Sequence, residues 1–90
     1  MLFVISYDLK SPGKDYSSLY EVIKSFGAWW HYLDSTWIIR SQRSVSDISD
    51  LIRQRMDAND RLIVAAISVH DTDGWLPQKA WDWIRENDKS

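Results

Sequence analysis

Hydrophobic and polar positions divide the 90-residue chain into strand-like and helix-like segments. Leu2 to Asp8 is a short, mostly apolar run that stops at a Lys-Ser-Pro-Gly-Lys turn, which is typical of a buried strand. Two further runs, Ala28 to Leu33 and Thr36 to Arg40, are rich in aromatic and β-branched residues. Because only Asp34-Ser35 separates them, we expect a tight hairpin.

Two segments repeat apolar residues at helical spacing. The first follows Asp15, a candidate helix cap, and Gly27 is well placed to end it because glycine adopts left-handed backbone angles without strain. Its apolar positions are Tyr16, Leu19, Tyr20, Ile23 and Phe26. The second begins at Ser44, with Asp47 three residues later in a capping-box arrangement. Its apolar positions are Val45, Ile48, Leu51, Ile52 and Met56.

Arg61 to Val69 predicts a fourth strand, followed by a polar loop and a short amphipathic helix that starts near Pro77 and turns Trp81 and Ile84 inward. The order β-α-β-β-α-β predicts an α+β, ferredoxin-like sandwich with a four-stranded antiparallel sheet in the order 4-1-3-2. We expect one domain over residues 1–90, with the core at about 1–69 and a helical tail at about 70–90.

This topology predicts which polar residues meet. The end of the first strand, the hairpin tip and the start of the fourth strand share one edge of the sheet. The residues gathered there are Asp8, Asp34, Ser35, Asn59, Asp60 and Arg61. The opposite edge holds Arg40, Ser41 and His70.

Assembly follows from the same pattern. Both alternating sets of the first strand are apolar, with Leu2 and Val4 on one side and Phe3 and Ile5 on the other. Two helices cover only one face, so the other face would be a large exposed apolar patch, and we expect a two-fold homodimer through it. The tail tryptophans Trp75, Trp81 and Trp83 are expected to cover part of this face, within the chain or across the dimer.

The amino-acid composition excludes several classes of function. A formal net charge of −2 argues against strong sequence-independent nucleic-acid binding, while leaving room for a local basic patch. The absence of cysteine excludes disulfides and thiolate metal sites. No stretch approaches the roughly 20 apolar residues of a membrane span, and the N-terminal pattern is not that of a signal peptide, so we expect a cytoplasmic protein without membrane contact.

Asp8 is the residue on which an enzymatic function depends. Its carboxylate stands at the tip of a buried strand, where it could bind Mg²⁺ and so polarise a phosphate or activate a water molecule. Asp60 or Asp34 on the same edge would supply a second carboxylate. The alternative is structural: Asp8 caps the following loop or pairs with Arg61.

Other polar and aromatic residues also allow two interpretations. Arg43, Arg53 and Arg61 are candidate phosphate contacts, but acidic residues alternate with the arginines near the second helix, which also fits a solvated face. His31 suits a proton shuttle or a hydrogen-bonded sheet histidine. The run His70 to Asp73 suits a metal cluster or a solvated loop. The tryptophans suit base stacking or, more simply, core and interface packing.

Two stretches of the chain resemble the CRISPR-associated protein two superfamily, and its small stand-alone SinR-like group most closely. They are Tyr7-Asp8-Leu9-Lys10-Ser11-Pro12-Gly13-Lys14-Asp15-Tyr16 and Trp30-His31-Tyr32-Leu33-Asp34-Ser35-Thr36-Trp37. The turn Asp57-Ala58-Asn59-Asp60 also fits, and the resemblance covers roughly residues 1–69. The chain departs from the CRISPR members because its first helix is not rich in arginine: Glu21 and Lys24 are its only charges.

The resemblance implies a ferredoxin-like dimer in which Asp8 of each protomer helps to bind a divalent metal ion. Some members of the superfamily cleave RNA or DNA, and others are non-catalytic scaffolds. We therefore expect a dimeric binding or scaffold module that holds a protein or nucleic-acid partner. The alternative is a Mg²⁺-dependent endonuclease, acting on RNA rather than DNA, that uses Asp8 from each protomer.

Overall fold

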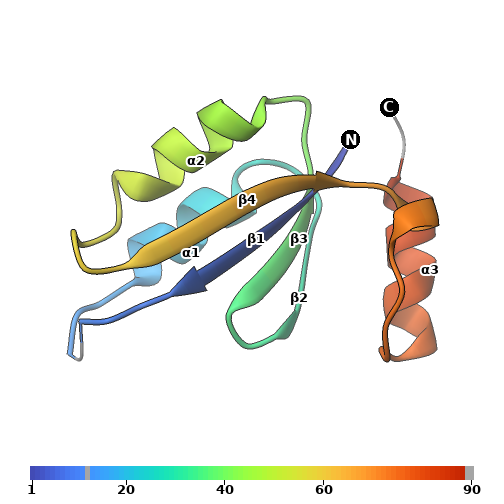
Figure 1. Cartoon of the computed structure of the whole chain (residues 1–90), viewed down its shortest axis with the longest axis horizontal. Coiled ribbons are helices and arrows are strands. Elements are labelled where there is room, and N and C mark those ends of the chain that lie inside the picture. Colours follow the sequence, from blue (N-terminus) through green and yellow to red (C-terminus); the bar gives the residue numbers. More distant parts are fainter. Residues whose placement is uncertain (12, 89–90) are drawn as a thin grey trace.

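A computed structural model describes residues 1–11 and 13–88; Pro12 of the predicted turn and the last two residues of the tail lie outside them. The chain forms a four-stranded antiparallel sheet with α1 and α2 on one face and α3 standing across one end of the sheet (Figure 1). The elements are β1 (Leu2–Asp8), α1 (Ser17–Lys24), β2 (Trp29–Leu33), β3 (Thr36–Arg40), α2 (Val45–Arg53), β4 (Arg61–Ile67), the 3₁₀ turn η1 (Val69–Asp71) and α3 (Gln78–Asn87).

The sheet order is β2-β3-β1-β4, which is the predicted order 4-1-3-2 counted from the opposite edge. β1 pairs with β3 and with β4, and both pairs are antiparallel and regular along their length. The hairpin of β2 and β3 forms as expected, but its register shifts between Trp30 and Leu33. β1 is therefore central, while β2 and β4 are the edge strands.

Local signals in the sequence place the helix ends. The Ser44 hydroxyl accepts the backbone N–H of Asp47 at 3.1 Å and caps α2 as predicted. The Asp15 carboxylate accepts the N–H of Ser17 at 2.9 Å at the start of α1. Gly27 follows α1 with a φ of 143°, and a Cβ there would collide with the backbone carbonyl oxygen of Arg40. The chain can therefore turn from α1 into β2 only with glycine at this position.

Alternating side chains of β1 divide the core into two clusters. Phe3 and Ile5 point toward α1 and α2, where the core also contains Leu19, Ile23, Trp37, Ile39, Ile48 and Ile52. Leu2 points to the other face and packs with Trp30, Ile38, Ala80 and Ile84. The sheet is thus apolar on both faces, as the sequence predicts, and α3 covers one end of the second face.

The tail differs from the prediction in detail. β4 ends at Ile67, because the chain turns at Val69–Asp71 to reach α3. Ile84 is buried and Trp81 and Trp83 pack against the second cluster, but Trp75 is 99% exposed, so it covers nothing within its own chain. In the described part of the chain, no helix has the length and apolar character needed to cross a membrane.

Candidate functional site

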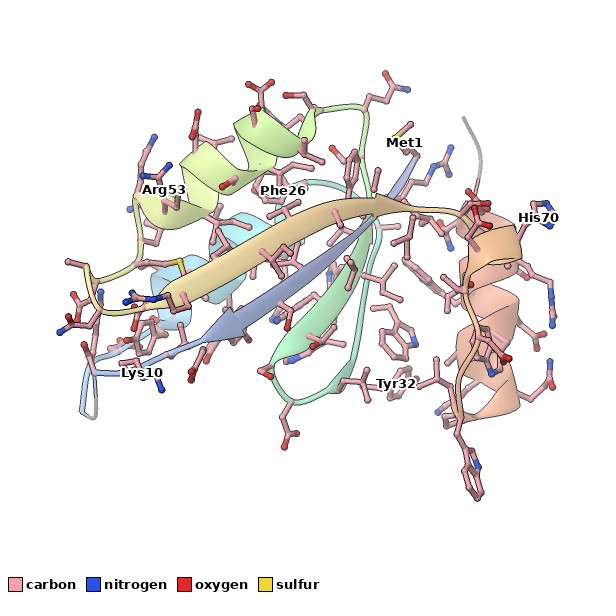
Figure 2. All side chains as sticks on the ribbon, viewed as in Figure 1. Met1, Lys10, Phe26, Tyr32, Arg53 and His70 are labelled. Carbon is pink, nitrogen blue, oxygen red and sulfur yellow. The ribbon has the colours of Figure 1, made fainter. Side chains whose placement is uncertain are left out.

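The predicted group of polar residues forms at the end of the sheet where β1 finishes. Asp8 is the cross-strand partner of Arg61, the first residue of β4. On the other side, the backbone N–H of Tyr7 donates to the carbonyl of Ser35 in the hairpin at 3.1 Å. The structure therefore brings the tip of β1, the hairpin and the turn before β4 to one edge. His70 lies at the opposite end of the molecule from Lys10, the residue next but one to Asp8 (Figure 2).

Asp8 is exposed and its carboxylate pairs with a cation, although not the expected one. The Lys10 ammonium lies 2.8 Å from Asp8 Oδ2, and both side chains are more than half exposed. Arg61 instead directs Nη1 to the backbone carbonyls of Ala58, Asn59 and Asp60, at 3.5, 3.2 and 3.0 Å. The Asp8–Arg61 pair, one of the two structural roles considered for Asp8, therefore does not form, because the guanidinium bonds the carbonyls of its own turn.

Asp60, the second predicted metal ligand, is only 8% exposed. Oδ1 accepts the backbone N–H of Lys10 at 2.7 Å, and Oδ2 accepts that of Asp57 at 2.8 Å. The Tyr16 hydroxyl donates to the same carboxylate, at 3.0 and 3.1 Å from its two oxygens. A cation at Asp60 would have to displace these donors, so the geometry favours a structural carboxylate.

The direction of the pKa shift of Asp60 agrees with a structural role for its carboxylate. Burial raises the pKa of Asp60, but donation from Lys10, Asp57 and Tyr16 to the charged carboxylate outweighs it and holds the pKa below its ordinary value. The pKa of Asp57 is also lowered, by hydrogen bonds from Ser11 and Lys14. Both carboxylates are thus stabilised in their charged form by the loop that follows β1.

This contact between two loops is what the sequence analysis missed. The Ser11 hydroxyl and the Lys14 ammonium, the latter at 3.0 Å, both bond the carboxylate of Asp57. These partners are more than 40 positions apart in the chain, so no local pattern could join them. The one signal present was the turn with aspartates at both ends, Asp57 and Asp60.

The three candidate arginines do not form one patch. Arg53 and Arg61 line the same groove between the end of α2 and the start of β4. Arg43 precedes α2 and lies over the ring of Phe26, 5.9 Å from its centroid. A nine-residue helix of about 13 Å separates it from Arg53, which itself lies 3.7 Å from the carboxylate of Asp50.

The histidine and tryptophan positions have mostly structural surroundings. The ring of His31 stacks on Trp37 at 3.7 Å, and its Nε2 lies 3.0 Å from the carbonyl oxygen of Asp34. Trp30 and Trp37 are buried in the two clusters. Among residues 1–11 and 13–88, no three acidic or histidine side chains gather in a way that would hold a metal ion.

An exposed row of side chains lies on the sheet face that α3 only partly occupies. Four side chains lie in register across it, one from each strand: Leu33, Thr36, Ser6 and Ile63. We call these four residues the open-face strip. Its two ends are apolar and exposed, Leu33 by 46% and Ile63 by 63%. The two hydroxyls in its middle are 3.1 Å apart and bond each other.

No family model matches the chain, and searches of curated proteins and of solved structures likewise find no match.

Proposed function

We propose that this chain is a small ferredoxin-like binding or scaffold module that forms a homodimer through the open-face strip. The order β-α-β-β-α-β and the sheet order support the ferredoxin-like assignment. Residues 1–69 resemble the CRISPR-associated protein two superfamily, and this resemblance supports the same assignment. The partner that the dimer holds is a protein or a nucleic acid.

The observation that carries the proposal is the exposure of Ile63. This side chain stands in the middle of a strand with 63% of its surface in water, and Val4 and Ala65 beside it on the same face are only half-buried. A two-fold contact would bury this surface in both protomers at once. The paired hydroxyls of Ser6 and Thr36 add little cost, because they already satisfy each other.

The experiment is sedimentation velocity on the wild type and on Ile63→Asp. Burying an unpaired carboxylate costs several kcal/mol, so we expect the variant to dimerise at least about 100-fold more weakly. Trp29→Asp is the matched control, because Trp29 is 43% exposed but lies beside Lys24 of α1, on the helix side of the sheet. Equal self-association of wild type and Ile63→Asp would contradict the proposal.

A metal-dependent endonuclease is the second candidate, and one observation favours it. Alternation along β1 puts Asp8 on the same face as Val4 and Ser6. A dimer through that face would therefore turn both Asp8 carboxylates toward the interface. The Lys10 ammonium would have to leave Asp8 for Mg²⁺ to bind. Phosphate contacts would fall to Arg53 and Arg61 on the groove and to Arg43 at its distant position.

The nuclease candidate is tested by incubating labelled single- and double-stranded RNA and DNA with Mg²⁺ or Mn²⁺. Cleavage by the wild type that is lost in Asp8→Ala, and kept in Glu21→Ala, would establish it. Glu21 is the control because it is an exposed carboxylate on α1, outside the candidate site. No cleavage, or equal cleavage by all three proteins, would remove Asp8 from catalysis.

A further inference from the structure

β4 is an edge strand whose outer side is unprotected. Among residues 1–11 and 13–88 it pairs only with β1, and the pairing is regular from Arg61 to Ile67. Natural edge strands are usually blunted by a proline, a lysine, a bulge or a covering element. β4, with the sequence Arg-Leu-Ile-Val-Ala-Ala-Ile, contains none of these residues and no bulge. Such an edge is a ready template for another strand.

The hydrogen-bond pattern identifies the free groups. Tyr7 donates its N–H to the carbonyl of Ser35, the residue just before β3, and the same register continues along β3. The odd-numbered residues of β1 therefore bond β3 and the even-numbered ones bond β4. The partners of those even residues in β4 are Arg61, Ile63, Ala65 and Ile67. The backbone N–H and C=O groups of Leu62, Val64 and Ala66 therefore point outward, away from the described part of the sheet.

We propose that β4 pairs with β4 of a second copy of this chain, antiparallel and with Val64 on the two-fold axis. Of the symmetric registers, this one pairs all seven residues of the strand. It places Val64 opposite Val64, Leu62 opposite Ala66 and Ile63 opposite Ala65 of the partner copy. The three outward residues of each copy would exchange hydrogen bonds across the axis and extend the sheet through both chains.

Side-chain fit favours a second copy over an unrelated strand. In this register Leu62 faces Ala66 and Ile63 faces Ala65, so two of the large side chains of β4 meet small ones across the axis. Arg61 is the only charged residue of the strand, and its partner in this register is Ile67. No like charges therefore oppose each other, which would otherwise weaken the pairing.

A groove beside the edge provides further contact area. It runs between α2 and β4, where Val45, Ser46 and Val64 line one end and Met56 and Leu62 the other. The charged side chains along it are already engaged, since Asp50 faces Arg53 and Asp57 bonds Lys14. A stable interface buries about 800 Å² per partner, roughly a seventh of this chain's 5844 Å² surface. Contact along both the strand edge and the groove would contribute to this area, and it would not bury the Asp50 or Asp57 carboxylate without a cation.

This interface is separate from the open-face strip. The strip uses side chains on the side of the sheet away from α1 and α2, whereas the edge uses the backbone of Leu62, Val64 and Ala66. A chain with both contacts would assemble further than a dimer, which suits a scaffold. The inference holds whether or not the open-face dimer forms.

The test is residue-resolved amide hydrogen exchange by NMR at several protein concentrations. Ile63 and Ala65 bond β1 and serve as internal references. At a concentration about 100 times the dissociation constant, the outward amides of Leu62 and Val64 should exchange about 100-fold more slowly than when unpaired, and the protection should fall on dilution. If the outward amides exchange at unprotected rates at every concentration, β4 does not pair with a second copy of this chain and the proposal is overturned.

Ala66→Pro supplies the matching variant. The proline ring removes the outward N–H of residue 66 and leaves the hydrogen bonds between β4 and β1 in place. Edge strands tolerate proline at such outward positions. Ala66 is exposed, so no core contact is lost, and Ala66→Ser is the control. We expect fast exchange at Leu62 and Val64 in the proline variant only. The same protection must persist in Leu33→Asp, which disrupts the open-face strip on a different strand. Protection lost in Leu33→Asp, or kept in Ala66→Pro, would contradict edge pairing.

Discussion

The Tyr16 hydroxyl donates to the carboxylate of Asp60 across 44 positions of the chain, at 3.0 and 3.1 Å from its two oxygens. With the N–H groups of Lys10 and Asp57, this contact fastens the loop after β1 to the turn before β4. Any function at the tip of β1 therefore depends on the carboxylate of Asp60, which is distant in the sequence but adjacent in space. Asp60 holds the candidate site in shape.

Replacing Asp60 should loosen this edge and lower stability. Asp60→Ala leaves the backbone N–H groups of Lys10 and Asp57 without their acceptor, and unpaired partly buried donors are costly. We expect the thermal midpoint to fall by at least about 5 °C, measured by circular dichroism. Asp34→Ala, at an exposed position of the same edge, should change it little. Similar midpoints for both variants would show that Asp60 does not fasten the loops.

Stability should also fall in acid. The pKa values of Asp15, Asp57 and Asp60 are lowered in the folded chain from an ordinary value of 3.8. A lowered pKa means that the charged form stabilises the fold above about pH 4, and that this stability is lost as pH falls through the folded pKa. Urea unfolding from pH 7 to pH 2 should show this loss. It should be smaller in Asp60→Asn, and an unchanged slope in that variant would contradict the assignment.

The two buried tryptophans of the hairpin should respond differently to the same replacement. Trp37 donates its indole N–H to the Tyr7 hydroxyl at 2.9 Å, whereas the indole nitrogen of Trp30 is buried without a partner among the described residues. Trp37→Phe removes a buried hydrogen bond as well as volume and should cost about 2 kcal/mol in urea unfolding. Trp30→Phe removes an unpaired donor and should cost about 1 kcal/mol less. Equal losses would mean that the Trp37–Tyr7 bond contributes nothing.

Gly27 should tolerate no side chain. Its φ of 143° is unfavourable for other residues, and a Cβ would collide with the backbone of Arg40. We expect Gly27→Ala to lower the free energy of unfolding by about 3 kcal/mol, because strain and steric contact add. Gly13→Ala shares the positive φ but has open space around it, so it should cost about 1 kcal/mol. Equal costs would place the whole effect in the backbone angle.

Short-range patterns account for what the sequence could predict. The boundaries of β1, the hairpin turn at Asp34-Ser35 and the cap at Ser44 each depend on residues within a few positions of one another. Helical spacing also predicted that Ile84 faces inward. It could not say against what, because Leu2 and Trp30 are more than 50 positions away. The structural role of Asp60 could not be predicted for the same reason: its donors at Lys10 and Tyr16 are distant in the chain.

The open-face homodimer is tested most directly by an isotope-filtered NOE experiment on a mixture of labelled and unlabelled wild-type chains. Only contacts between copies give signals, so no substitution is needed. The account predicts intermolecular NOEs from the methyl groups of Ile63 and Leu33, the exposed ends of the open-face strip. Leu33 lies on β2, away from the β4 edge, so a spectrum without intermolecular NOEs at the Leu33 methyls, or with them only on the α2 side at residues such as Val45, would contradict it.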